Sequence, residues 1–379
     1  MDLEASVIES VDAMRGDILA ASRWLYDHPE LSGEEHESAR FLARCAELRG
    51  FKVEHGVAGL PTAFVAVRHG GRWGDAGPRR RAAFLAEYDA LPEMGHGCGH
   101  NMIGTVSVYA AIALANVADE LDGDVVLCGT PSEETTGGKI SMLEAGLFDG
   151  ISAALMAHPS SHTEIAYATL ASIPLEVEYY GRSSHAVSNP DKGVNALDAM
   201  LHLFQSVKAI KAAFSPTAHA PGVILHGGGR ANVVPHYTKA EFSIRGKDRS
   251  EAEDVMNRVL ACAHAAAKAT GASLGHRING NIYLDMRPDP RLAEVFRGIW
   301  LRLGGGDPLT ESPPHGSIDI GNLSHVFPCL HPSFRITGAE GVAGHSREFA
   351  EATLTPFAGE QMVRAIKALA TTGLHVLKA

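Results

Sequence analysis

The chain has 379 residues, of which 45% are hydrophobic and 20% are charged, and its formal net charge is −11 at pH 7. Because single hydrophobic cores stop growing at roughly 250–300 residues, this length predicts two domains, and the composition excludes a largely disordered protein. The acidic balance disfavours a nucleic-acid partner, which needs a basic face, and no apolar run approaches the roughly 20 residues that span a bilayer, so no membrane partner is expected.

The N-terminal stretch MDLEASVIESVDAMRGD carries acidic residues early and has no apolar core of signal-peptide length. The chain has 5 cysteines, an odd and scattered set. Without a leader, such a set is typical of reduced thiols, so we expect a cytoplasmic location. Histidine is the compositional outlier, with 20 in the chain, and several of them occupy patterned positions.

The first part of the chain alternates between helical and strand-like patterns. Apolar residues recur at helical spacing over residues 5–50, and short apolar runs typical of strands follow at 62–67, 81–87, 123–129 and 153–158. Helical patterns at 103–118 and 139–145 separate the last three runs. This alternation predicts an α/β domain with a mostly parallel sheet, in which chemistry collects at the carboxyl ends of strands.

The pattern changes near residue 171. A strand at 173–180 is followed by a helix at 196–214, strands at 222–227 and 240–245, a helix from 250 to 270 and a strand at 273–279. This β-α-β-β-α-β order is typical of the split βαβ, ferredoxin-like fold. We therefore predict an α+β domain over residues 172–282, inserted into an α/β domain made of residues 1–171 and 283–379.

Four polar clusters come after predicted strands or late in the chain. They contain Cys98 and His100, Glu133 and Glu134, His158, and His345. Each cluster alone is more often an incidental loop, core or capping group, and adjacent acids usually form a solvated face. Two unpaired carboxylates at the end of a buried strand would be costly, however, and a cation removes that cost. Together the thiolate, imidazoles and carboxylate predict a site for zinc, manganese or nickel.

The order of motifs resembles that of the dinuclear metal hydrolases, a family that includes aminoacylases, carboxypeptidases G and p-aminobenzoyl-glutamate hydrolases. It is most similar to the branch with a cysteine metal ligand, which also contains β-alanyl-lysine dipeptidases. The shared motifs are AEYDALP at 86–92, HGCGHN at 96–101, EE at 133–134, GGK at 137–139, HP at 158–159, GRSSHA at 181–186, NALDA at 195–199, NVVP at 232–235, GSID at 316–319 and His345. They cover nearly the whole chain.

The resemblance implies a site for two divalent metal ions, with zinc or manganese favoured and nickel or cobalt as alternatives. It implies that Cys98 bridges the two ions. The remaining ligands would be His100, Glu134, His158 and His345.

The resemblance also implies roles for three acidic residues. Glu133 would be the general base that deprotonates a metal-bridging water and then protonates the leaving amine. Asp89 would orient a ligand, although a loop or capping role is the alternative. Glu87 stands where other branches carry a ligand histidine, so it stays outside the metal set.

In the inserted domain, the resemblance implies that His185 reaches an active site, often across a dimer interface, and polarises the scissile carbonyl. Asn232 and Arg245 would hold the substrate carboxylate, which arginine binds through a bidentate fork. The alternative for each is an ordinary surface residue. The inserted domain would serve as a lid and would join two copies of the chain in a homodimer.

We therefore expect metal-dependent hydrolysis of an amide bond in an N-acyl amino acid or small dipeptide with a free carboxylate. The alternative from another class is a non-catalytic relative that keeps the fold and a carboxylate pocket, and the intact ligands and base argue against it. A serine hydrolase would need a Gly-x-Ser-x-Gly elbow, and a zinc deaminase would need a Pro-Cys-x-x-Cys motif. Both are absent from the sequence.

Overall fold

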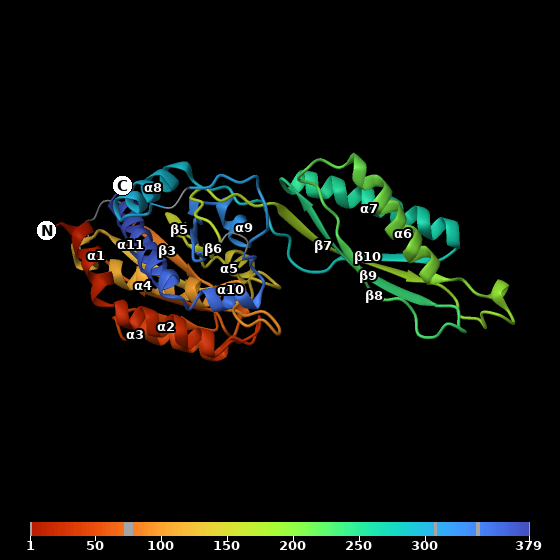
Figure 1. The fold of residues 1–379 in the computed structure, drawn as a ribbon, viewed down its shortest axis with the longest axis horizontal. Coiled ribbons are helices and arrows are strands. Elements are labelled where there is room, and N and C mark those ends of the chain that lie inside the picture. Colours follow the sequence, from red (N-terminus) through yellow and green to blue (C-terminus); the bar gives the residue numbers. More distant parts are fainter. Residues whose placement is uncertain (1, 72–78, 307–308, 339–341, 379) are drawn as a thin grey trace. The chain divides into compact units, whose positions relative to one another are not determined.

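The computed structural model describes residues 2–71, 79–306, 309–338 and 342–378. It divides into two compact units (Figure 1): Met1–Ala168 with Arg287–Pro313 and Asp319–Ala379, and Thr169–Met286 with Pro314–Ile318. The sequence placed these boundaries at 171/172 and 282/283. The roles of the two units, catalytic domain and lid or dimerisation domain, stay predictions.

The first unit is built on a six-stranded sheet in the order β1-β2-β4-β3-β5-β11. Its strands are β1 (Lys52–His55), β2 (Phe64–Arg68), β3 (Arg80–Ala86), β4 (Gly123–Gly129), β5 (Ala153–Leu155) and β11 (Cys329–Leu330). The four neighbouring strands β4, β3, β5 and β11 pair in parallel. At one edge, β1 pairs antiparallel with β2, and β2 pairs antiparallel with β4. The predicted mostly parallel sheet is confirmed.

The apolar run over residues 153–158, predicted as one strand, is two strands in two different sheets. After β5 ends at Leu155, β6 (His158–Ser160) pairs in parallel with β12 (Ser333–Arg335) in a separate two-stranded sheet. Met156 and Ala157 between them are fully buried. An apolar run continues across the break, so hydrophobicity alone could not show where the chain leaves the central sheet.

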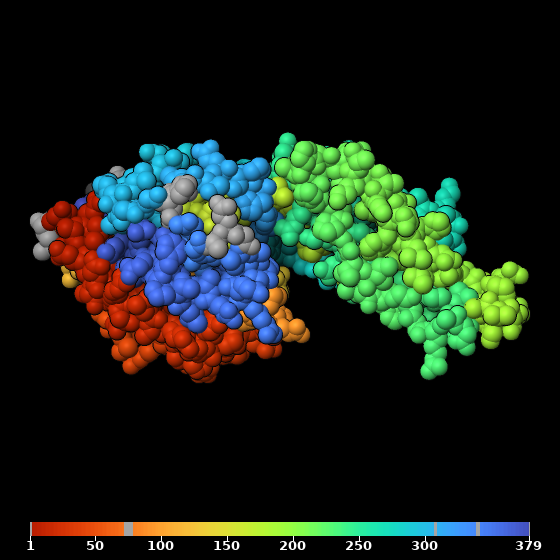
Figure 2. Space-filling model, viewed as in Figure 1, coloured from red at the N-terminus to blue at the C-terminus, as the bar shows by residue number. Residues whose placement is uncertain are grey.

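Helices cover both faces of this sheet. They are α1 (Leu3–Ala13), α2 (Arg15–Asp27), α3 (His36–Glu47), α4 (His100–Ala115), α5 (Gly138–Glu144), α8 (Pro290–Arg302), α9 (Ile320–Ser324), α10 (Arg347–Ala352) and α11 (Pro356–Lys378). The two ends of the chain pack together, because α11 contacts α1, and Lys367 Nζ lies 2.6 Å from Asp12 Oδ1. In the space-filling view the N-terminal red segments and the C-terminal blue segments lie side by side (Figure 2).

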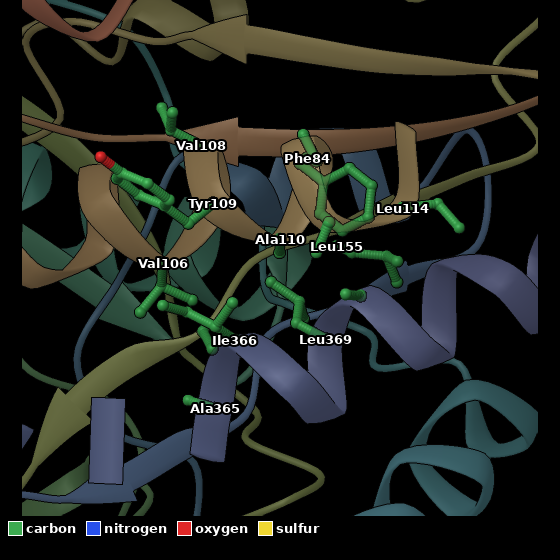
Figure 3. Close-up of a cluster of buried hydrophobic side chains, with 14 of the residues drawn as sticks. Phe84, Val106, Val108, Tyr109, Ala110, Leu114, Leu155, Ala365, Ile366 and Leu369 are labelled. Atoms are coloured by element: carbon green, nitrogen blue, oxygen red, sulfur yellow. The ribbon is translucent and has the colours of Figure 1, made fainter. Parts of the chain in front are cut away.

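Helix α4 runs through the middle of this unit and fixes one part of the site. Every residue of α4 is buried, as expected for a helix that is apolar on all sides. Figure 3 shows Val106, Ala110 and Leu114 of α4 packed with Phe84 of β3 and Leu369 of α11. Burying each large side chain of this kind stabilises the fold by about 1.5–3 kcal/mol, so the first residue of α4, His100, sits on a rigid element.

The second unit is a four-stranded antiparallel sheet in the order β10-β7-β9-β8, with two helices on one face (Figure 1). The elements are β7 (Ala171–Tyr180), α6 (Ala196–Ile210), β8 (Gly222–His226), β9 (Tyr237–Gly246), α7 (Arg249–Thr270) and β10 (Ser273–Ile278). The predicted β-α-β-β-α-β order is confirmed. Ile173, Leu203, Phe242 and Val259 belong to a hydrophobic core separate from that of the first unit.

No helix within the described parts of the chain is both long enough and apolar enough to cross a membrane. The longest, α11, has 23 residues. It packs against α4, α8 and α1, and its apolar face therefore serves the core of the first unit.

Candidate metal centre

The polar clusters predicted from the sequence follow the carboxyl ends of neighbouring strands. Glu87 and Asp89 come directly after β3, Glu133 and Glu134 follow β4, and His158 begins β6 just beyond β5. Strands β3, β4 and β5 run parallel to one another, so their carboxyl ends lie at the same edge of the sheet. The sheet itself therefore gathers these side chains.

Gly99 lets the chain turn between Cys98 and His100. It has a φ of 81°, in the left-handed region, and a Cβ added there would lie 2.4 Å from Pro159 Cγ. Only glycine fits such a position without strain. The turn brings Cys98 Sγ to 3.6 Å from Nε2 of His158.

Asp89 fixes the orientation of the His100 ring. His100 Nδ1 lies 2.9 Å from Asp89 Oδ1, while Asp89 Oδ2 accepts hydrogen bonds from Ser32 Oγ at 2.8 Å and from the Glu134 amide at 3.0 Å. Burial raises the pKa of Asp89, but the charge and hydrogen bond of His100 outweigh it and hold this pKa well below its usual value. Burial lowers the pKa of His100, but Cys98 and Asp89 raise it by more, so His100 is protonated without a cation. With Nδ1 donating to an ionised Asp89, Nε2 is the atom that can bind a cation once the cation displaces its proton.

Glu134 connects the two sides of the centre. Its Oε1 lies 3.7 Å from His100 Nε2 and 3.5 Å from His345 Nε2. His345 is on a loop and its side chain is 56% exposed, but its amide donates to the Gly97 carbonyl at 2.8 Å, which ties that loop to the Cys98 turn. Glu133 also points to this place, with Oε2 4.0 Å from His100 Nε2.

Two residues at the centre have a strained backbone. Ser132 has a φ of 60° and His345 a φ of 59°, in the left-handed region that costs a non-glycine residue about 1–3 kcal/mol. Ser132 precedes the two glutamates and His345 faces one of them. Such strain persists only where the surroundings impose it, which is common at functional sites.

The side chains fit two divalent cations. Two groups of potential ligand atoms, each within 4.8 Å of one another, share Cys98: one adds His100 and His158, and the other adds Glu134 and His345. Nε2 of His100 and Oε1 of Glu134 are buried without a hydrogen-bond partner among the described residues, a situation that costs about 1–3 kcal/mol per group. Sulfur, nitrogen and oxygen donors of this kind suit zinc and related ions.

Burial sets the protonation states of two predicted ligands in this centre, His158 and Cys98. Burial, helped by the charge of His100, lowers the pKa of His158 to about 4, so His158 is neutral at pH 7 and its ring can bind a cation. Burial raises the pKa of the Cys98 thiol. A nearby cation would offset that burial, because it stabilises the thiolate directly.

The three residues predicted in the inserted domain belong to the second unit. His185 is exposed and pairs through an antiparallel bridge with Val233, next to the exposed Asn232. His185 Nδ1 accepts hydrogen bonds from the amides of Val187 at 3.3 Å and Ser188 at 3.1 Å. Arg245 is half-buried on β9, where its Nε donates to Ser243 Oγ at 3.0 Å. Their substrate-binding roles stay predictions.

Sequence reasoning did not assign a role to His331. This buried residue follows β11, and its ring centroid lies 5.7 Å from that of His158 and 5.7 Å from that of Tyr167. The sequence held a signal, since His-Pro-Ser occurs at both 158–160 and 331–333. Burial holds the pKa of His331 well below its usual value, so His331 is a neutral neighbour of a predicted ligand.

Comparisons with known proteins place the chain among peptidases and related hydrolases. Residues 168–271 match the model of a peptidase dimerisation domain. The chain is 35% identical to the Xaa-Arg dipeptidase of Mus musculus over 99% of this chain and 89% of that protein. It is 31% identical to a p-aminobenzoyl-glutamate hydrolase polypeptide of Escherichia coli over 72% of this chain and 59% of that protein.

A solved structure shares the fold over almost the whole chain. It is that of a Bacillus subtilis protein, a dinuclear metal-binding peptidase from the M20 family. The TM-score is 0.72 and the sequence identity 20%, over 97% of this chain and 99% of that one. The arrangement of a mostly parallel α/β unit with a separate α+β unit is thus confirmed by an independent structure.

Proposed function

The chain belongs to the M20 family of metallopeptidases, and from this premise we propose that it hydrolyses the amide bond of an N-acyl amino acid or small dipeptide with a free carboxylate. Peptidase and hydrolase relatives support amide hydrolysis in general. The observation that carries the proposal is the meeting of Cys98, His100, Glu134, His158 and His345 beside Glu133.

In this proposal Cys98, His100 and His158 would hold one ion, and Cys98, Glu134 and His345 would hold the other. A bound pair of divalent ions supplies Lewis acidity, which lowers the pKa of water and polarises a carbonyl group. Zinc and manganese suit this mixed donor set, and nickel and cobalt are alternatives. Asp89 keeps the His100 ring in the orientation that the site requires.

Glu133 would act as the general base and acid. It would accept a proton from the attacking water and deliver it to the leaving amine. Burial, followed by the charges of Glu87, Asp319 and Glu134, raises the pKa of Glu133 well above its ordinary value. A carboxylate with a raised pKa removes a proton more effectively than an ordinary one, which supports this role.

The second unit would supply substrate-binding groups. Because His185 Nδ1 accepts two backbone hydrogen bonds, the ring proton lies on Nε2, and this makes the ring a donor for a carbonyl oxygen. Asn232 and Arg245 would hold the substrate carboxylate, with the guanidinium as a bidentate donor.

We also propose that two copies of the chain associate through the second unit, which carries the match to a peptidase dimerisation domain. Strand β8 is at the edge of the sheet, and its Val223 and Leu225 are 55% and 53% exposed. Exposed apolar residues on an edge strand are typical of a surface that pairs with another chain.

The test is an activity profile of manganese- or zinc-loaded protein against N-acetyl amino acids, dipeptides with varied C-terminal residues, and p-aminobenzoyl-glutamate. Glu133→Ala should retain its ions and lose turnover. Near-wild-type turnover of Glu133→Ala would refute the proposed base. Protein that binds its ions but hydrolyses none of these amides would instead be a non-catalytic relative.

A further inference from the structure

Three residues from motifs without an assigned role meet in a buried ion cluster. Lys139 lies in the first turn of α5, Glu87 follows β3, and Asp319 precedes α9. Lys139 Nζ donates to Glu87 Oε1 and, at 2.7 Å, to Asp319 Oδ1. The side chains of Lys139 and Asp319 are 0% exposed and that of Glu87 is 1% exposed.

This cluster borders the metal centre. Glu87 Oε2 lies 3.7 Å from His100 Nε2, the atom predicted to bind an ion. Carboxylate oxygens of Glu87, Glu133 and Asp319 lie within 4.8 Å of one another. Three carboxylates this close are themselves a set of ligands for a hard cation. Glu87 is therefore close enough to the metal centre to bind an ion in place of one of the predicted ligands.

The ammonium of Lys139 already compensates these charges. Two of its three hydrogens are used by Glu87 and Asp319, and the backbone amide of Lys139 donates to the other oxygen of Asp319 at 3.0 Å. Burial lowers the pKa of Lys139, but Asp319, Glu87 and Glu133 raise it by more. The lysine is therefore charged, and Asp319 is fixed by two bonds from one residue.

We propose that Lys139 is a positioning residue that serves as a built-in cation and keeps Glu87 and Asp319 out of the metal-ligand set. The ions are then bound by Cys98 and the predicted histidines and Glu134, while the three-carboxylate cluster holds an ammonium in place of a metal ion. This inference rests on the proposed function, because it concerns which side chains bind the ions.

The first experiment measures ion content in Glu87→Gln. The amide oxygen still accepts a hydrogen bond from Lys139, but it is a far weaker ligand for a divalent ion than a carboxylate. Glu87→Gln should hold as many manganese ions per chain as the wild type, measured by atomic emission after gel filtration. Glu134→Gln, the matched change in a predicted ligand, should hold fewer. Loss of an ion from Glu87→Gln would overturn the proposal.

The second experiment removes the internal cation with Lys139→Met. The three carboxylates should then recruit a divalent ion. Lys139→Met should bind an additional manganese ion, and its thermal midpoint should rise more steeply with added manganese or magnesium than that of the wild type. Unchanged ion content and an unchanged response to cations would overturn the proposal, because a merely structural lysine would affect neither.

The matched control is Lys239→Met in the second unit. Lys239 Nζ lies 2.6 Å from Glu176 Oε2, and Arg277 remains as a second partner of that carboxylate. This variant should bind ions as the wild type does. If Lys139→Met does not accumulate as folded protein even with cations present, Glu87→Gln decides, because it leaves the Lys139–Asp319 pair intact. A wild type that binds no ions would refute the proposed function instead.

Discussion

Asp89, which follows β3, and His100, the first residue of α4, are hydrogen-bonded at 2.9 Å, and both side chains are buried. Asp89 reaches a residue eleven positions further along the chain, and it also accepts bonds from Ser32 and from the Glu134 amide. One carboxylate thus connects the segments that follow β3 and β4 with the start of α4. Asp89 acts on the metal centre by orienting the His100 ring, so its role can be tested through ion binding, separately from turnover.

Asp89→Asn should weaken ion binding by about 10–100-fold, the usual effect of losing a partner that orients a ligand. One oxygen of Asp89 accepts from His100 and the other accepts from the Glu134 amide. Asparagine has only one acceptor oxygen, so it cannot make both bonds, and the His100 ring loses its fixed orientation. Competition with a chromogenic chelator measures the affinity. Ser32→Ala removes only one bond to Asp89 and should have a smaller effect. Wild-type affinity in Asp89→Asn would show that His100 needs no orienting partner.

Gly99→Ala should destabilise the protein and lower its ion content. The left-handed φ costs an alanine roughly 1–2 kcal/mol, and the added methyl group would collide with Pro159. Gly50→Ala is the matched control, because Gly50 also has a left-handed φ, 84°, but no atom within 4 Å of an added Cβ. Urea unfolding and ion analysis of both variants test this. Equal losses of stability would show that the contact with Pro159 is unimportant.

Leu369→Ala should lower the free energy of unfolding by about 2–5 kcal/mol, because it opens a cavity between α11 and α4. Leu369 is fully buried in the cluster of Figure 3. Leu301→Ala on α8 is the control, since Leu301 is 51% exposed and surface changes usually stay within about 0.5 kcal/mol. Urea unfolding measures both. A small effect of Leu369→Ala would mean that α11 is not part of the cooperative core.

Much of the architecture could be predicted because strands and helices alternate with clear apolar periods. The strand predicted at 123–129 is β4, and the order of elements in the second unit follows the predicted pattern. The short strands β6 and β12 were not predicted. They pair residues far apart in the sequence, Ser333 with His158, and a three-residue strand carries too little local pattern to be recognised.

The site shows the same division between local and distant information. Each predicted ligand follows a strand or lies in a recognisable motif, so the sequence pointed to it. The Lys139 cluster was different, because Lys139 and Asp319 are 180 positions apart. A lysine after two glycines reads as an ordinary surface residue at the start of a helix. Only the packing of α5 against α9 makes it a buried counter-ion.

Acid should weaken the second unit through Glu176. The hydrogen bond from Lys239 holds the pKa of Glu176 below its usual value, against burial, and Arg277 adds to this effect. A carboxyl with a depressed folded pKa contributes stability above its unfolded pKa, about 4.3, and that contribution is lost as pH falls through the folded pKa. The thermal midpoint of the wild type should therefore fall more between pH 6 and pH 3 than that of Glu176→Gln. A parallel fall in both proteins would rule out this contribution.

Replacing His345 and replacing His100 should change the stability of the ion-free protein by different amounts, although both residues are predicted ligands. His345 is 56% exposed, so His345→Ala should change the stability of ion-free protein by no more than about 0.5 kcal/mol. His100→Ala leaves Asp89 buried without its charged partner, which costs about 3–5 kcal/mol. Both variants should bind fewer ions than the wild type. Chelator-treated samples give the ion-free stabilities, and full ion content in His345→Ala would remove His345 from the ligand set.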